Sequence, residues 1–331
     1  MKKIISILLV LVMVLSFSLL TACGDKGDDK EAITVAVVVA DGFGDRSFYD
    51  SAKAGLDKLE ADCGIIAKTT ECKGENFKQA MMNAAEVADI VVPVGWQFYD
   101  IEAIAPDYPD TKFIWVDNEM STTLDNVLCI SYAQNEGSFL AGYIAAKMSK
   151  TNVVGAVGGE DNAVINDFFA GYEQGAKYAN KDCKFVKNYA NDFEDPAQGK
   201  ECATSLNSKG ADVIFQVAGN TGSGVFEAAK ENNFYAIGVD SDQKYIDPNR
   251  IICSMQKEVG KSIYDVIKDF VDNGTWEANR TWIADMATGY IQIGYGEDGS
   301  KQQISDELKA EVKDLADKII SGEIKVNTTR K

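Results

Sequence analysis

The sequence has 331 residues, 46% hydrophobic and 25% charged, a length and composition that allow about two domains with buried cores. It contains 51 Asp plus Glu against 33 Lys plus Arg, and the resulting formal net charge of -18 argues against a nucleic-acid partner. The absence of histidine excludes a Ser-His-Asp triad, a Cys-His pair and a zinc site built on histidine.

The start of the chain has the features of an export signal. Two lysines precede an apolar run from Ile4 to Leu20, which is close to the shortest length that spans a bilayer and ends in small residues. We therefore predict a cleaved signal peptide over residues 1–22. The sequence Leu-Thr-Ala-Cys resembles a bacterial lipobox, which implies lipidation of Cys23 and attachment to the extracytoplasmic face of the cell membrane. An ordinary cleaved signal with an incidental cysteine is the alternative.

Residues 23–32 are polar and contain glycine, so we expect them to form a flexible tether between the lipid and the folded chain. Removal of residues 1–22 takes away two lysines and no acid, which lowers the formal charge from -18 to -20. Six cysteines remain after Cys23, without the CxxC spacing of a metal or redox motif, and we predict neither a metal nor a cofactor. Both oxidised and free states of these cysteines are compatible with the sequence; they are Cys63, Cys72, Cys129, Cys183, Cys202 and Cys253.

From Ile33 onward, short β-branched runs alternate with helical stretches. The first series has predicted strands at Thr34–Ala40, Ile65–Thr69, Ile90–Val94 and Lys112–Val116, with a helix at Ser47–Glu60. The second series has predicted strands at Val153–Val157, Phe185–Tyr189, Val213–Val217 and Tyr235–Gly238, with helices at Asn166–Tyr178, Pro196–Ser208 and Gly224–Asn232. Apolar strands separated by helices are typical of parallel sheets covered on both faces, so the pattern predicts an α/β protein with two similar halves.

The remaining predicted elements are too few for a third domain. A strand at Val127–Tyr132 and a helix at Asn135–Met148 lie between the two series. After residue 250 come a strand at Ile251–Met255, a helix near Val259–Asn273, a strand near Gly289–Ile293 and a helix at Ser305–Ile320. We expect these late segments to return and complete the first two domains.

In open parallel sheets the ligand lies at the carboxyl ends of the strands. The turns at these ends are rich in aromatic, amide and carboxylate side chains and poor in nucleophiles, which indicates a solute with a flat part and a hydroxyl-bearing part. Neither the glycine-rich segment 219–224 nor Gly260-Lys-Ser completes a nucleotide-binding motif. No base accompanies Ser47 or Ser138, so the sequence favours a binding protein over an enzyme.

Several segments occur in the order found in one known family. They are the lipobox, Asp45–Phe48, Glu136–Gly142, Asn191–Pro196, Gly219–Phe226 and Ile237–Gln243. Together they resemble the basic membrane protein family of ABC-importer substrate-binding lipoproteins, typified by purine nucleoside receptors. The resemblance implies a type I periplasmic-binding-protein fold, in which two Rossmann-like lobes with parallel sheets are joined by three crossovers. It also implies an ABC permease and an ATPase as partners, and no enzymatic activity.

The expected lobes are 33–131 plus 256–286 for the N-terminal lobe and 132–255 plus 287–331 for the C-terminal lobe. In the family a purine lies between two phenylalanines, which by motif position resemble Phe48 and Phe193. Asp240 resembles the acceptor of the ribose hydroxyls, Asp242 is its alternative, and Lys257 resembles a cleft lysine. Further candidates in the same turns are Asp41, Asp45, Ser47, Trp96, Asp117, Asn118, Gly219 and Asn220.

The predicted function is that of a lipid-anchored receptor which closes its lobes on a purine nucleoside and delivers it to the permease. One departure concerns the base, because the family's purine receptors often have an Asp-Asn pair ahead of the Ser-Phe turn, whereas Asp41 has no asparagine beside it. The alternatives are a receptor for another flat or sugar-like solute, such as riboflavin, a pentose or a signal molecule, a sensory or adhesive lipoprotein, and an enzyme acting on a nucleoside.

Overall fold

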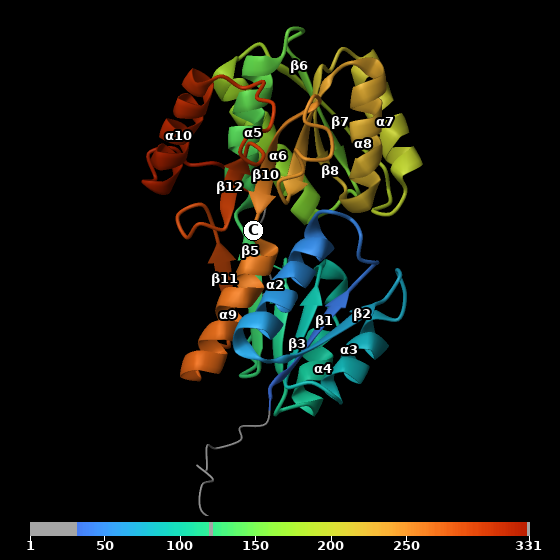
Figure 1. The fold of residues 1–331 in the computed structure, drawn as a ribbon, viewed down its shortest axis with the longest axis vertical. Coiled ribbons are helices and arrows are strands. Elements are labelled where there is room, and N and C mark those ends of the chain that lie inside the picture. The colour runs from blue at the N-terminus through green and yellow to red at the C-terminus, as the bar shows by residue number, and fades with distance from the viewer. Residues whose placement is uncertain (1–31, 119–121, 330–331) are drawn as a thin grey trace, which may run out of the picture. The chain divides into compact units, whose positions relative to one another are not determined.

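Figure 1 shows the computed structural model, which describes residues 32–118 and 122–329. The predicted signal peptide, the predicted lipidation site Cys23 and all but the last residue of the predicted tether lie outside the described residues. From Ile33 onward the chain forms one compact unit. Among the described residues no helix is both long enough and apolar enough to span a membrane.

The first sheet of the described chain has the strand order β11-β5-β4-β3-β1-β2, and all of its strand pairs are parallel. Its strands are β1 (Thr34–Val39), β2 (Ile66–Glu71), β3 (Ile90–Val94), β4 (Lys112–Val116), β5 (Val127–Tyr132) and β11 (Arg280–Ala284). The inner strands are apolar and buried, as expected of a sheet covered on both faces. Its helices are α2 (Phe48–Cys63), α3 (Phe77–Ala85), α4 (Ile101–Ile104) and α9 (Val259–Asn273).

Helix α9 lies beside α2, although the two are far apart in the chain (Figure 1). Glycines permit this close packing, because a Cβ atom on Gly260 would lie 2.1 Å from the carbonyl oxygen of Ser51. A Cβ atom on Gly55 would lie 2.2 Å from the carbonyl oxygen of Gly260. The first sheet with these helices is called the N-terminal lobe below.

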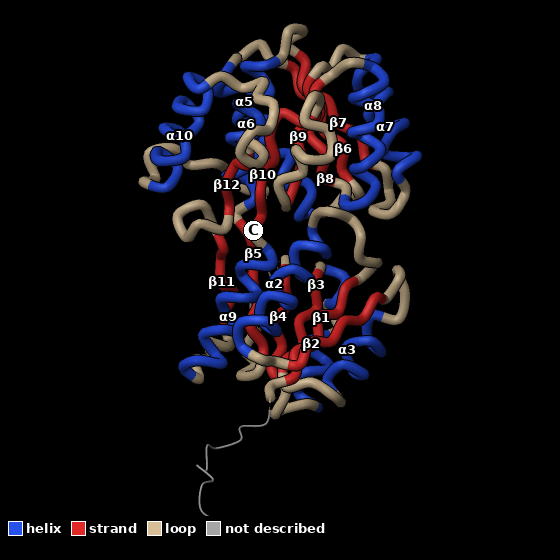
Figure 2. The backbone as a smooth tube through the Cα atoms, viewed as in Figure 1, coloured by secondary structure: helices blue, strands red, loops and turns tan. Residues whose placement is uncertain are grey.

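The second sheet has the order β12-β10-β9-β8-β6-β7 within the described chain. Its strands are β6 (Val153–Gly158), β7 (Lys184–Tyr189), β8 (Val213–Val217), β9 (Tyr235–Asp240), β10 (Ile251–Lys257) and β12 (Ile291–Gly294). Its helices are α5 (Gln134–Met148), α6 (Ala163–Ala179), α7 (Pro196–Ser208), α8 (Gly222–Asn232) and α10 (Asp306–Ile320). This sheet and its helices are called the C-terminal lobe, and Figure 2 shows the strands of each lobe flanked by helices.

The two sheets confirm the predicted α/β class, with two differences. Strand β12 pairs antiparallel with β10, so the second sheet is not wholly parallel. Strand β11 was not predicted, because it is a short edge strand whose residues are mostly exposed or half-buried and form no apolar run. It pairs with β5 and extends the first sheet.

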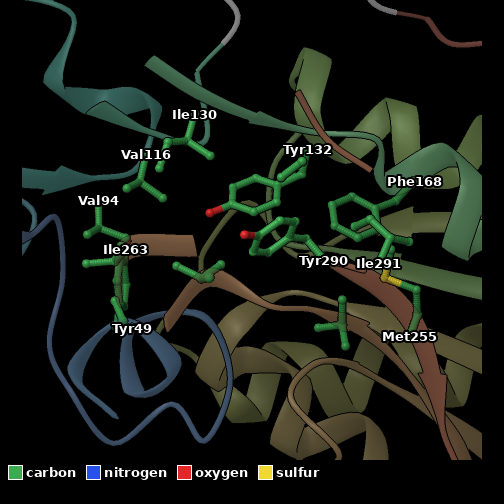
Figure 3. Packing of buried hydrophobic residues seen from close by; sticks show 14 of the residues in the cluster. Tyr49, Val94, Val116, Ile130, Tyr132, Phe168, Met255, Ile263, Tyr290 and Ile291 are labelled. Atoms are coloured by element: carbon green, nitrogen blue, oxygen red, sulfur yellow. The ribbon is translucent and has the colours of Figure 1, made fainter. Parts of the chain in front are cut away.

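The chain passes between the lobes in three places. It crosses from β5 to α5 at Ala133, from β10 to α9 at Glu258, and from β11 to β12 through residues 285–290. Buried side chains of both lobes meet near these crossovers, where Tyr132 and Tyr290 lie close to Phe168 in Figure 3. The hydroxyl groups of Tyr132 and Ser262 are 2.6 Å apart.

Candidate functional site

A pocket enclosing about 620 Å³, the open space at its mouth included, lies at the carboxyl ends of strands of both sheets. Eight predicted residues line the pocket, and they are Asp45, Phe48, Trp96, Asp117, Phe193, Gly219, Asp240 and Lys257. Side chains of both lobes therefore form one pocket, at the edge of the sheets where the turns were expected to bind a solute.

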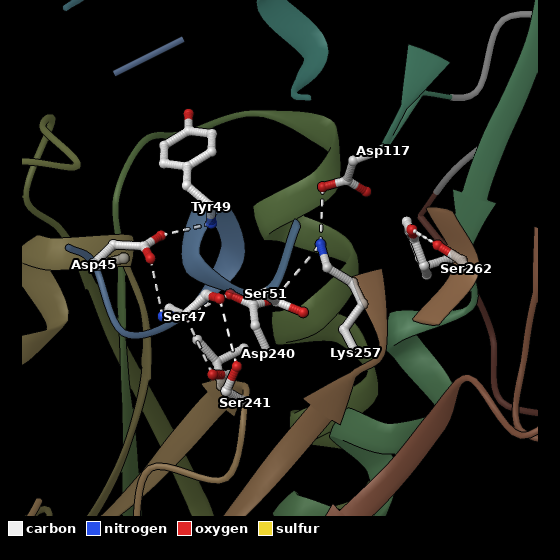
Figure 4. A network of polar contacts seen from close by, with 12 residues as sticks. Asp45, Ser47, Tyr49, Ser51, Asp117, Asp240, Ser241, Lys257 and Ser262 are labelled. Carbon is white, nitrogen blue, oxygen red and sulfur yellow. Dashed lines mark hydrogen bonds and ion pairs between the residues drawn. The ribbon is translucent and has the colours of Figure 1, made fainter. Parts of the chain in front are cut away.

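A buried charged group joins the lobes at this pocket (Figure 4). The Nζ atom of Lys257, at the end of β10, lies 2.8 Å from Asp117 Oδ2, which follows β4. The same atom lies 3.8 Å from Asp240 Oδ1, at the end of β9. Burial raises the pKa of Asp240, while Lys257 favours its charged form. The ion pair between Lys257 and Asp117 thus links the two lobes through residues that also line the pocket.

The backbone has an unusual conformation at both aspartates of this group. Asp117 has φ 63° and Asp240 has φ 62°, in the left-handed region that costs a residue with a Cβ atom about 1 kcal/mol or more. Each lies at the carboxyl end of a buried strand, where the chain must turn. Such backbone is often found at functional sites, and here it occurs at two acids that line the same pocket.

The loop before α2 also connects the lobes. Ser47 Oγ donates a hydrogen bond to Asp240 Oδ2 at 2.6 Å, and the same hydroxyl is 3.2 Å from the carbonyl oxygen of Val239. Ser47 is fully buried. It does not line the pocket, and its role in the structure is to hold the carboxylate that does.

Asp45 caps the start of α2. Its carboxylate accepts hydrogen bonds from the backbone N–H groups of Ser47, Tyr49 and Asp50 at 3.0, 2.9 and 3.1 Å. Burial raises the pKa of Asp45 to about 7, although these bonds lower it, and the nearby charge of Asp240 raises it further. A capping role therefore explains this carboxylate at least as well as direct contact with a ligand.

The two predicted phenylalanines line the pocket from opposite lobes. Phe48 begins α2, and its ring centroid is 4.6 Å from Lys257 Nζ, within range of a cation–π interaction. Phe193 lies in the loop between β7 and α7, with its ring against Gly159, where a Cβ atom would be 2.2 Å from the ring. Both rings are half-buried and keep part of their surface free.

Two candidates are held by other contacts and do not line the pocket. Asp242 accepts hydrogen bonds from the backbone N–H groups of Lys244 and Gly296 at 3.1 and 2.6 Å, so its carboxylate stabilises a turn. Asn118 is buried, and its side-chain amide donates to Cys129 Sγ at 3.6 Å. Of the two aspartates at the end of β9, only Asp240 is placed at the pocket.

Asp41 and Asn220 lie close to pocket residues without lining the pocket themselves. The hydroxyl of Tyr49 donates to Asp41 Oδ2 at 3.2 Å, and burial raises the pKa of Asp41. The side-chain amide of Asn220 donates to Glu194 Oε2 at 3.1 Å. Tyr49 and Glu194 both line the pocket, so Asp41 and Asn220 contact residues of the pocket lining without belonging to it.

The pocket also contains residues that sequence reasoning missed. They are Tyr49, Gly95, Gln97, Asn162, Val164, Ile165, Phe168, Glu194, Val217, Ala218 and Val239. Asn162 caps α6, since its Oδ1 accepts from the N–H of Ile165 at 3.0 Å, and an asparagine before a helical run is a signal that could have found it. Phe168 is 2% exposed, and its ring centroid lies 5.2 Å from Lys257 Nζ. Its helical spacing is typical of a core residue, so no sequence signal pointed to this position.

In the described part of the chain, no three Cys, Asp or Glu side chains are grouped so that they could hold a metal ion. The six cysteines that follow Cys23 are free thiols in the structure, four of them buried.

Comparison with known protein families gives one match over nearly the whole chain. The family described as PnrA-like ABC transporter substrate-binding proteins matches residues 32–330. Basic membrane protein A2 of Borrelia garinii subsp. bavariensis is 33% identical over 323 residues, covering 96% of this chain and 95% of that protein. The CD4+ T-cell-stimulating antigen of Listeria innocua is 34% identical over 361 residues, with 98% of this chain and 99% of that protein covered.

Solved structures agree with these relatives. A solute-binding protein of an ABC transporter system from Aeropyrum pernix K1 has a TM-score of 0.80 and 28% identity, and covers 90% of this chain and 94% of its own. A solute-binding protein of an ABC transporter system from Conexibacter woesei has a TM-score of 0.72 at 22% identity, which shows the fold alone. The predicted periplasmic-binding-protein fold is thereby confirmed.

Proposed function

The chain belongs to the PnrA-like family of ABC transporter substrate-binding proteins, and from this membership we propose that its solute is a purine nucleoside. Members of this family are extracytoplasmic, membrane-associated solute receptors and are not enzymes. ATP hydrolysis and translocation therefore belong to partner subunits of the importer. What we propose beyond this is the solute, the residues that hold it and the lipid anchor.

The observation that carries the proposal is the pairing of two aromatic rings from opposite lobes with a buried carboxylate in one pocket. Phe48 and Phe193 stack on the two faces of the purine, each stack contributing roughly 1 to 3 kcal/mol. Asp240 accepts hydrogen bonds from the two ribose hydroxyls, and Lys257 donates to the sugar or the base. Asp117 holds the ammonium group of Lys257 in place.

Binding and closure are one event in this scheme. Each of the two lobes supplies one ring, so the solute contacts both faces only when the lobes are close together. The ligand must bind the closed form more tightly than the open form, because a solute with equal affinity for both would not change their populations. The permease then recognises the closed receptor.

Calorimetric titration with inosine, guanosine, adenosine, ribose and riboflavin tests the proposed solute. We expect a nucleoside to bind far more tightly than ribose or riboflavin. If no nucleoside gives heat at high concentration and riboflavin or a pentose binds tightly, the solute is not a nucleoside.

The lipid anchor is proposed to be attached to Cys23 after removal of residues 1–22. A Cys23→Ala variant expressed in the native host should leave the membrane fraction, whereas Cys63→Ala should remain in it. Membrane retention of both variants would contradict the anchor and leave the solute-binding proposal untouched.

A further inference from the structure

The contacts proposed above leave the edge of the purine almost without partners. Phe48 and Phe193 are assigned to the faces of the base, and Asp240 is assigned to the ribose. Lys257 donates to the sugar or the base, but its ammonium group is also held by Asp117. The edge of a purine carries hydrogen-bond donors and acceptors in the plane of the ring, so a pocket that holds it selectively needs further polar groups of both kinds.

Gln97 supplies an acceptor from the N-terminal lobe. It lies in the short helix η1 (Trp96–Phe98), just after the carboxyl end of β3, and it lines the pocket. Its Oε1 atom is buried and makes no hydrogen bond with the described residues. A Cβ atom on Gly95 would lie 2.4 Å from this oxygen, so the glycine makes room for the amide. A buried acceptor without a partner destabilises the protein, and a solute with an N–H group at this position would remove that cost.

Asn162 supplies a donor from the C-terminal lobe, and it also lines the pocket. Its Oδ1 atom accepts from the N–H of Ile165 at the start of α6, which fixes the orientation of the amide, because the amino group could not take the place of Oδ1 in this bond. The Nδ2 atom is buried and makes no hydrogen bond with the described residues. Burial raises the pKa of Glu160 and the amide of Asn162 opposes this shift, so the two side chains are near each other without being bonded. The Nδ2 donor is therefore available to a solute.

We propose that Gln97 and Asn162 determine solute specificity by binding the edge of its flat part, which must carry both a donor and an acceptor. For a nucleoside, which rests on the proposed function, this edge is that of a 6-oxopurine. The N1–H group of the base donates to Gln97 Oε1, and O6 accepts from Asn162 Nδ2. A solute that lacks one of these groups leaves a buried polar atom of the pocket unpaired and binds less tightly.

The first test compares inosine with purine riboside, which keeps the ring faces and the ribose but lacks O6 and the N1–H group. In calorimetry, the natural protein should bind inosine at least about tenfold more tightly. Gln97→Met removes the amide at similar size, and Asn162→Ser removes Nδ2 while keeping an oxygen that can cap α6. Each variant should lower the ratio of the two affinities about fivefold or more. The control Gln79→Met, at an exposed position of α3, should keep the ratio of the natural protein. The natural ratio in either pocket variant would overturn the proposal.

The second test needs no nucleoside. Gln97→Met removes a buried acceptor that has no partner in the protein, so the melting temperature of the ligand-free protein should stay the same or rise. A fall would show that the amide serves the structure, and it would overturn the proposal even if inosine binds. If no nucleoside binds and the melting temperature does not fall, the proposed solute is wrong, and the result supports binding of a different solute edge by the two amides.

Discussion

Ser47 Oγ lies 2.6 Å from Asp240 Oδ2, so a hydroxyl of the N-terminal lobe donates to a carboxylate of the C-terminal lobe. Asp240 is also the residue proposed to hold the ribose hydroxyls, and its other oxygen lies 3.8 Å from Lys257 Nζ. The position of this carboxylate therefore depends in part on a contact with the opposite lobe. The proposed ligand contact and a contact between the lobes are linked through one side chain.

Substitution Ser47→Ala tests this link. It removes the hydroxyl donor and leaves one oxygen of a buried carboxylate without that partner, a loss of about 1 to 3 kcal/mol. We expect nucleoside affinity measured by calorimetry to fall about five- to a hundredfold. Ser51→Ala, in the first turn of α2, removes a contact within the N-terminal lobe only and should leave the affinity unchanged. Equal affinities of the two variants would contradict the link.

Removal of either aromatic ring of the pocket is expected to weaken nucleoside binding. Phe48→Ala and Phe193→Ala should each weaken nucleoside binding by at least about 1 kcal/mol, because each removes one stacking surface. Phe270→Ala removes a partly buried ring of the N-terminal lobe that does not line the pocket, and it should lower the melting temperature without changing the affinity. If either pocket variant binds the nucleoside as tightly as the natural protein, that ring does not stack on it.

The role of Asp240 is tested by comparing a nucleoside with its free base. Asp240→Asn replaces a charged acceptor with a neutral amide, so inosine should lose affinity by about tenfold or more relative to hypoxanthine. Asp242→Asn alters a carboxylate that accepts backbone N–H groups away from the pocket, and it should affect both ligands alike. A similar loss for inosine and hypoxanthine in Asp240→Asn would exclude contact with the ribose.

The environment of Asp45 predicts that stability falls as the pH rises. Its pKa is about 7 in the folded protein, above its ordinary value of 3.8, so between these values the folded state binds more protons than the unfolded state. The free energy of unfolding must then decrease from about pH 4 to pH 7, by up to a few kcal/mol from this group. Urea unfolding at pH 4.5 and pH 7 should show a smaller decrease in Asp45→Asn than in the natural protein. The control variant Asp57→Asn, at an exposed site, should show the same decrease in the free energy of unfolding as the natural protein. If the decrease in Asp45→Asn is as large as in this control, the pKa of Asp45 is not raised in the folded protein.

The sequence predicted the fold well because buried parallel strands and covering helices each leave a strong pattern. It could not predict β11, whose residues are mostly exposed or half-buried at a sheet edge. Within the pocket, the choice between Asp240 and Asp242 depends on a left-handed turn at Asp240, which residue identity alone does not reveal. Phe168 was not predicted as a pocket residue for a different reason. A buried aromatic residue on a helix has the same sequence pattern whether its side chain faces the core or a pocket.

We propose that both lobes close on a purine nucleoside through Phe48, Phe193 and Asp240. A crystal structure of the protein with guanosine would decide this. We expect the base to lie between the two rings and the ribose hydroxyls to lie within hydrogen-bonding distance of the Asp240 carboxylate. Guanosine bound away from these rings, or a pocket that stays empty at saturating guanosine, would contradict it.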